Sequence, residues 1–106
     1  MTTKLLQKDE PIPYKLLLLA DETVEAINKY ITKSEIYGLE IEDILVGTYA
    51  FYELSKDEIE IKNIAVLEGF QGKGFGTFLL KDAIERAKKR AIKIFLSVLT
   101  RLMFIN

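Results

Sequence analysis

Three glycines at alternate positions, set between a strand-like segment and a helix-like segment, constrain the fold of this chain more than any other feature. Glu58 to Leu67 alternates apolar with polar residues and predicts a strand, and the glycines follow within Gln71–Thr77. Apolar residues at helical spacing then predict a helix to about Arg90, and Lys93 to Leu99 predicts a last strand. The order of strand, glycine loop, helix and strand indicates a βαβ unit, for which a right-handed crossover is expected.

The residues before this unit predict further strands and two helices. The expected elements are a strand at Thr3–Gln7, a helix at Tyr14–Ala20, a helix capped by Asp21 or Thr23, and strands at Ile36–Ile41 and Ile44–Leu54. A turn is expected at Glu42–Asp43, although neither residue is the glycine that a tight hairpin prefers. We find no internal repeat and no linker, so the sequence predicts one α/β (α+β) domain over residues 1–106.

Composition excludes several kinds of chemistry. The chain has no cysteine and no histidine, which excludes disulfides, thiolate nucleophiles, Ser-His-Asp triads and the usual zinc sites. Acid–base work must then fall to carboxylates, lysines, tyrosines or the termini. A formal net charge of -1 gives no electrostatic footprint for nucleic acid or an anionic membrane. Because no signal peptide and no apolar run of membrane-spanning length is visible, we expect a cytoplasmic protein.

The strand before the glycine loop contains an irregularity. Ile59 and Ile61 alternate with charged residues, but the next apolar residues are Ile64 and Val66, so the pattern shifts by one position. A β-bulge produces such a shift, and it would leave backbone groups free for a ligand. The alternative is that Asn63 faces solvent at a frayed strand end. The strand pattern alone favours neither interpretation.

The glycine loop itself predicts an anion site, because exposed N–H groups at a helix N-terminus attract phosphate. The alternative is a glycine-rich turn needed only for backbone conformation. Two nucleotide motifs fail here. Thr77 stands where the dinucleotide fingerprint needs its last glycine, and Phe75 stands where a P-loop needs its lysine.

The loop does fit the acetyl-CoA loop of the GNAT superfamily of N-acetyltransferases. That pattern is an arginine or glutamine, two residues of any type, a glycine, one further residue, and a glycine or alanine, which Gln71, Gly74 and Gly76 satisfy. Ile64–Ala65–Val66 also resembles the bulged fourth strand of that family. The resemblance extends over residues 3–99 and is strongest over residues 58–90. It implies a mixed, mostly antiparallel central sheet with helices on both faces.

The resemblance also implies a function and binding residues. It implies acetyl transfer from acetyl-CoA to a primary amine of a small molecule or protein, with no covalent enzyme intermediate and no metal. Backbone N–H groups of the loop would hold the pyrophosphate of CoA. The strand would pair with the pantetheine arm through Ile64 and Val66, and the N–H near Val66 would face the thioester carbonyl. The implied cofactor-binding residues are Ile64, Ala65, Val66, Gln71, Gly72, Lys73, Gly74, Phe75, Gly76 and Thr77.

Three polar residues near these positions have two interpretations each. Glu60 lies four residues before Ile64, where some family members carry a general-base glutamate, but it can equally be a strand residue paired with a lysine. Lys73 would add charge near the CoA phosphates, or be a solvated loop lysine. Asn63 would orient a substrate or water beside the bulge, or serve no catalytic purpose.

The end of the chain departs from the family pattern. Family members continue past the fifth strand with a helix and two strands, which commonly supply a tyrosine that protonates the thiolate. Here the sequence ends at Asn106, and we expect a truncated acetyltransferase lacking that C-terminal helix and those strands. The alternative function is a non-catalytic CoA-binding or interaction domain. The apolar residues of 94–99 and 102–105 would leave an exposed edge, so we expect a homodimer formed through the C-terminal strand and tail.

Overall fold

The computed structural model describes residues 1–103 of the chain. Its elements are β1 (Thr3–Leu5), α1 (Tyr14–Leu17), α2 (Val24–Asn28), the 3-10 helix η1 (Ile31–Lys33), β2 (Ser34–Ile41), β3 (Ile44–Ser55), β4 (Glu58–Val66), α3 (Phe75–Lys89), β5 (Lys93–Leu96) and α4 (Val98–Met103). No helix of residues 1–103 is both long enough and apolar enough to cross a membrane.

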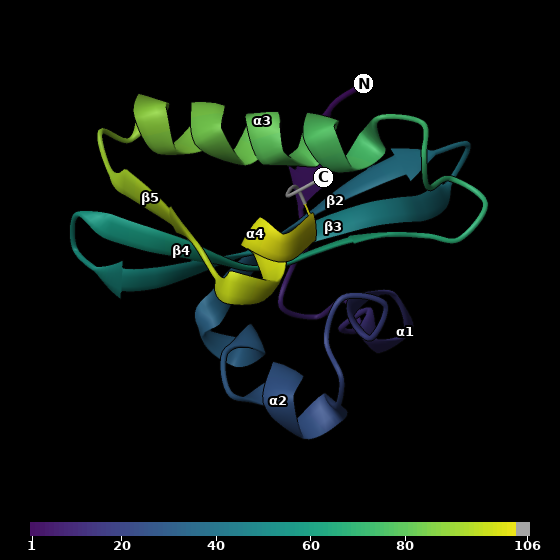
Figure 1. Ribbon diagram of the computed structural model, residues 1–106, viewed down its shortest axis with the longest axis horizontal. Helices are drawn as coiled ribbons and strands as arrows, with labels where there is room; N and C mark the ends of the chain where they lie inside the picture. Colours follow the sequence, from purple (N-terminus) through teal and green to yellow (C-terminus); the bar gives the residue numbers. More distant parts are fainter. Residues whose placement is uncertain (104–106) are drawn as a thin grey trace.

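The five strands form one sheet in the order β1-β2-β3-β4-β5. The first four strands pair antiparallel, whereas β4 and β5 run parallel and are joined by α3. Helix α3 covers one face of the sheet, and the short helices α1 and α2 lie on the other (Figure 1). The sequence prediction of a mixed, mostly antiparallel sheet with helices on both faces is therefore confirmed.

Each face of the sheet has its own hydrophobic core. The core under α3 contains Tyr37, Leu39, Val46, Tyr49, Phe51, Ile59, Ile61, Ile64, Val66, Leu79, Ala83 and Ala87. The core under α1 and α2 is smaller and contains Leu17, Ile27, Tyr30, Ile31, Ile36 and Ala50. Strands β2 and β3 contribute to both cores, and β4 contributes four residues to the larger one.

A polar network fixes α3 to the sheet at the rim of the larger core. The buried Tyr49 hydroxyl donates to Asp82 Oδ2 at 2.8 Å and accepts from Arg86 Nε at 3.0 Å. Arg86 Nη2 also donates to Thr3 Oγ1 at 3.0 Å, which brings β1 into the network. Burial raises the pKa of Tyr49, so its hydroxyl stays protonated and remains a donor. These bonds hold the long helix, and therefore its N-terminus, in a defined position.

The turn at Glu42–Asp43 is confirmed, and it forms without glycine. Both residues have positive φ, 51° and 68°, as a two-residue turn that matches the twist of its strands requires. The extent of the first helix was predicted too long, because α1 ends at Leu17 and residues 18–20 continue as turns.

The prediction of a strand over residues 93–99 is wrong beyond Leu96. Ser97 accepts a hydrogen bond on Oγ from the backbone N–H of Thr100 at 3.1 Å, which is a helix cap. The Thr100 side chain is buried and donates to the carbonyl of Ile61 at 3.1 Å. Residues 98–103 therefore form α4 instead of extending β5. Of the predicted apolar tail, residues 104–106 lie outside the described residues.

Candidate functional site

The predicted bulge lies in β4. Phe51 of β3 is opposite Ile61, and the adjacent residue Ala50 is opposite Asn63, so Lys62 is the extra residue of the bulge. Asn63 is only 1% exposed, and it points to the face that α1 and α2 cover. The bulge interpretation is confirmed, and the interpretation of Asn63 as a solvent-facing residue at a frayed end is wrong.

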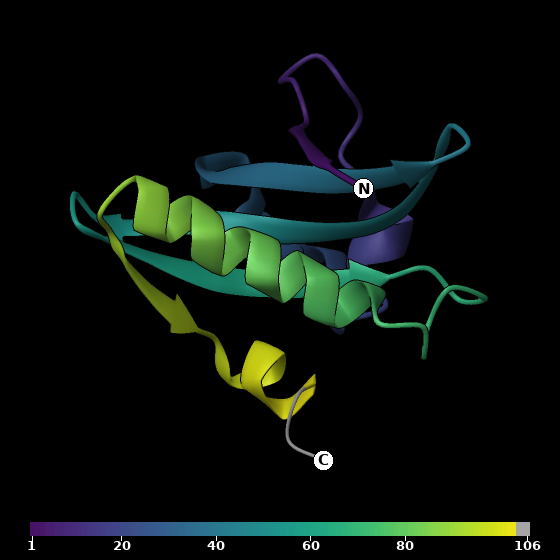
Figure 2. The same cartoon turned by 90° about the horizontal axis from the view of Figure 1, so that it is seen from above.

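Beyond the bulge, β4 has an open edge. Its pairing with β5 covers only Glu58 to Ile61 within the described residues, and β5 then diverges toward α4 (Figure 2). On the other side, Leu67 donates to the carbonyl of Val46 across the β3–β4 pair at 2.8 Å. Antiparallel pairing alternates, so the backbone N–H and C=O groups two and four residues earlier also point to β3. Those of Ile64 and Val66 consequently point to the open edge.

The glycine loop leads from this edge to α3. Gly69, Gly72 and Gly74 have φ of 90°, 75° and 88°, a region in which other residues are strained. A side chain at Gly72 or Gly74 would meet no atom within 4 Å, so neither glycine is needed for packing. The space beside the loop is open to a ligand.

The N-terminus of α3 presents free donors. Gly74 is its N-cap, and no side chain caps the helix. The first hydrogen bond of the helix runs from Phe78 N to Gly74 O at 3.0 Å. The N–H groups of residues 75–77 precede it and have no partner within the helix. Together with the dipole of a helix of 15 residues, these groups favour an anion.

Gln71 holds the loop against the strand. Its side-chain Nε2 donates to the carbonyl of Val66 at 2.9 Å. The rings of Phe70 and Phe75 pack with their centres 6.1 Å apart, and both border the core under α3. Sequence analysis assigned Gln71 to the site through its backbone, and the structure adds a positioning contact of its side chain.

A cavity of about 400 Å³ joins the open strand edge to the loop and the helix N-terminus. It is lined by Leu19, Ala20, Ile64, Ala65, Val66, Phe70, Gln71, Gly72, Gly74, Gly76 and Thr77. All the predicted cofactor-binding residues line it except Lys73 and Phe75. The Lys73 ammonium lies 5.9 Å from the centre of the Phe70 ring, and Phe75 packs against the core.

Sequence analysis did not find Leu19 and Ala20, which form part of the cavity wall. They follow α1 and lie more than 40 residues before the other lining residues in the chain. No local motif marks them, because they reach β4 only through the packing of α1 on the sheet.

Glu60 lies outside this cavity. Its carboxylate forms an ion pair with the Lys62 ammonium at 2.6 Å, and its side chain is 20% exposed. The same ammonium lies 5.1 Å from the centre of the Tyr52 ring. The structure thus shows the pairing with a lysine that the sequence left open for Glu60.

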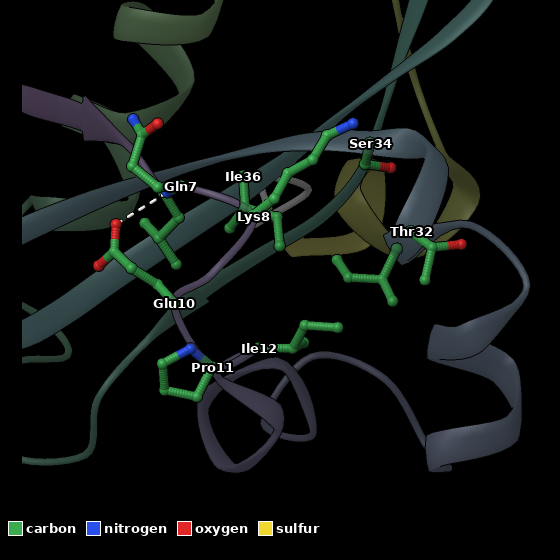
Figure 3. A pocket seen from close by; sticks show the side chains of 10 residues that line it. Gln7, Lys8, Glu10, Pro11, Ile12, Thr32, Ser34 and Ile36 are labelled. Carbon is green, nitrogen blue, oxygen red and sulfur yellow. Dashed lines mark hydrogen bonds between the residues drawn. The ribbon is translucent and has the colours of Figure 1, made fainter.

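A second cavity, of about 280 Å³, lies between the segment after β1 and the start of β2 (Figure 3). Aliphatic side chains that include Ile12 and Ile36 form part of its lining, and polar side chains of Gln7, Lys8 and Glu10 lie around it. Glu10 accepts a hydrogen bond from the backbone N–H of Gln7 at 2.8 Å. None of the predicted site residues lines this cavity, so the cavity beside the glycine loop is the candidate site.

Comparisons with known proteins agree with this geometry. The model of the acetyltransferase (GNAT) family matches residues 3–101. The uncharacterized N-acetyltransferase YvbK of Bacillus subtilis (strain 168) is 45% identical over 76 residues, which are 72% of this chain and 49% of that protein. The chain therefore spans about half the length of this curated relative.

Two solved structures have the same fold with a ligand bound. A GNAT family acetyltransferase from Elizabethkingia anophelis, with acetyl-CoA bound, has 39% sequence identity and a TM-score of 0.86 over 97% of this chain and 71% of that one. A Bacillus subtilis acetyltransferase in complex with CoA has 36% identity and a TM-score of 0.80 over 95% of this chain and 70% of that one. The family match covers nearly all the described residues, and it shows that this chain belongs to the acetyltransferase (GNAT) family.

Proposed function

We propose that this chain binds acetyl-CoA in the cavity beside the glycine loop and transfers its acetyl group to a primary amine of a small molecule or protein. One observation carries the proposal. A single cavity joins an unpaired strand edge, an uncapped helix N-terminus and glycines with open space beside them. The acetyl-CoA and CoA bound by two similar acetyltransferases support the same choice of ligand.

The chemistry of the cavity fits the parts of acetyl-CoA. The pyrophosphate would accept hydrogen bonds from the N–H groups of residues 75–77, where the helix dipole favours its charge. The pantetheine arm contains two amides, which would pair with backbone groups of the open edge such as those of Ile64, as an added strand does. Lys73 does not line the cavity, and its charge would therefore act from the rim.

The transfer needs few groups from the protein. The amine nitrogen attacks the thioester carbonyl carbon, a C–N bond forms, the C–S bond breaks, and CoA leaves as a thiolate. The N–H of Val66 would donate to the carbonyl oxygen as negative charge develops there. The ammonium must lose one proton before its nitrogen can attack, and the nitrogen gives up a second proton as the amide forms, which the leaving thiolate takes up. We assign the first proton to Glu60, acting through water, because it lies four residues before Ile64, where the resemblance implies a general-base glutamate.

One observation favours a second function, in which the chain binds CoA without transferring acetyl groups. Glu60 does not line the cavity and is engaged by Lys62. A panel of amines, acetyl-CoA and a thiol-reactive dye would distinguish the two functions. Amine-dependent release of thiol supports transfer, whereas tight binding in calorimetry without thiol release supports the binding module. Absence of acetyl-CoA binding would contradict both.

We also propose that two copies of the chain associate through the C-terminal region. Strand β5 lies at the edge of the sheet, and Phe95, Val98 and Leu99 are exposed large apolar side chains on β5 and α4. An open strand edge beside exposed apolar side chains is a template for pairing with another chain. Light scattering from micromolar to millimolar concentration should report a dimer. A monomer throughout that range would contradict the proposal.

A further inference from the structure

The buried carboxamide of Asn63 bonds the bulge to the helices on the far face of the sheet. Its Nδ2 donates to the carbonyl of Leu17 at 3.0 Å and to the hydroxyl of Tyr30 at 3.1 Å. The Tyr30 hydroxyl in turn donates to Asp21 Oδ2 at 3.0 Å. Burial raises the pKa of Tyr30, so its hydroxyl remains a donor. One side chain of β4 thus holds both ends of the segment 17–30.

That segment forms part of the cavity wall. Leu19 and Ala20 lie two and three residues after the Leu17 carbonyl that Asn63 holds, and they line the cavity together with the open edge of β4. The helices on either side are short, four residues in α1 and five in α2. Helices of this length are not stable by themselves, so their position depends on contacts with the sheet.

The second polar atom of the Asn63 side chain shows what the amide is needed for. Its Oδ1 is buried and has no hydrogen-bond partner among residues 1–103. An unpaired buried acceptor is unfavourable, and an apolar side chain of similar size would avoid that cost. The two donations of Nδ2 are therefore the contacts that an amide at this position contributes.

We propose that Asn63 is a positioning residue that couples the bulge of β4 to the wall at Leu19 and Ala20. Asn63 would then hold Leu19 and Ala20 in place beside the open edge of β4, where the pantetheine arm would bind. This inference rests on the proposed binding of acetyl-CoA. It assigns Asn63 no contact with the reacting atoms.

The variant Asn63→Leu tests this coupling without leaving a buried group unpaired. Without the Asn63 amide, the Leu17 carbonyl still accepts from Ala20 N and Asp21 N, both at 3.1 Å, and Tyr30 still donates to Asp21. We therefore expect the variant to fold.

The matched control is Thr48→Val. Thr48 is also fully buried, lies on the same face of the sheet, opposite Ala65, and its hydroxyl has no partner among the described residues. Replacing it removes a buried polar atom from the same face of the sheet but no hydrogen bond to the segment 17–30.

Calorimetry with two ligands separates positioning from a general structural defect. The probes are acetyl-CoA and 3′-phosphoadenosine 5′-diphosphate, which carries the nucleotide and pyrophosphate of CoA without the pantetheine arm. Asn63→Leu should weaken acetyl-CoA binding about tenfold, which is about 1.4 kcal/mol, and change binding of the fragment less than about twofold. Thr48→Val should leave both affinities unchanged. Equal weakening of both ligands, or no weakening of either, would overturn the proposal.

Hydrogen exchange without ligand tests the coupling independently of the proposed function. In Asn63→Leu the amides of residues 18–21 should exchange faster, while those of α3 stay as slow as in the parent chain. Unchanged exchange at residues 18–21 would refute the coupling even if acetyl-CoA binds. If the parent chain binds neither ligand, the proposed function fails, and the exchange result alone decides the coupling. Should Asn63→Leu not fold, Tyr30→Phe removes one of the two contacts and should shift both measurements in the same direction.

Discussion

The two halves of β4 both place apolar side chains in a core but have different partners. Residues 58–61, the closed half, pair with β3 on one side and with β5 on the other. Residues 64–66, the open half, pair with β3 alone among the described residues and line the cavity. Both halves place isoleucines and valine in the core under α3. The apolar pattern therefore does not determine which half binds a ligand.

The bulge at Lys62 and the start of α4 create this difference. Ser97 N and the Thr100 hydroxyl both donate to the carbonyl of Ile61, at 3.1 Å each, and so end the pairing on the β5 side. The bulge then turns the following residues so that β5 cannot remain beside them. Strand β4 is therefore paired on both sides at one end and open on one side at the other, within three residues.

The largest expected effect is that of Glu60→Gln, because Glu60 lies in the closed half and has the proposed role of general base. Glu60→Gln should slow acetyl transfer about a hundredfold at pH 7 while acetyl-CoA affinity stays nearly unchanged, as removal of a general base does. The loss should shrink at high pH, where the acceptor amine loses its proton unaided. Steady-state kinetics across pH would measure this. Unchanged turnover at pH 7 would make the closed half purely structural and Glu60 an ion-pair partner of Lys62.

The second prediction tests the loop that borders the open half. Gly74→Val should weaken acetyl-CoA binding more than tenfold, or about 1.4 kcal/mol. The added side chain would project into the open space beside the loop, and φ of 88° would strain the helix N-cap. Calorimetry measures the affinity, and a thermal melt shows whether the variant is folded. Equal affinity of a folded Gly74→Val chain would exclude the loop as the pyrophosphate site.

The bulge and the glycine loop could be predicted from sequence because their signals are local. The shift from Ile61 to Ile64 in the apolar pattern indicated the bulge, and the spacing of Gln71, Gly74 and Gly76 indicated the loop. Both signals depend on residues that are neighbours in the chain. The structure brings the bulge and the loop together, because the loop connects the end of β4 at Val66 to the start of α3 at Phe75.

The parts that sequence analysis missed depend on distant contacts or on competing local preferences. Leu19 and Ala20 reach the cavity only through the packing of α1 on the sheet. Val98 and Leu99 continue an apolar run that suits a strand, and periodicity cannot distinguish a short buried strand from a helix. The hydroxyl of Ser97 decides in favour of a helix, since it caps the backbone of Thr100.

The smallest expected effect comes from deleting Lys62, which tests the bulge itself. Deletion would restore strict alternation from Ile59 to Val66, so each core side chain keeps its face of the sheet and its partner on β3. The strand would then be straight, and β5 would compete with the ligand for the backbone groups of Ile64. Losing one such hydrogen bond costs about 1 kcal/mol, so acetyl-CoA should bind about fivefold more weakly. Lys62→Ala is the control, because it removes the ion pair with Glu60 but keeps the bulge, and calorimetry should report unchanged affinity. If the folded deletion variant binds acetyl-CoA as tightly as the parent chain, the open half does not owe its binding edge to the bulge.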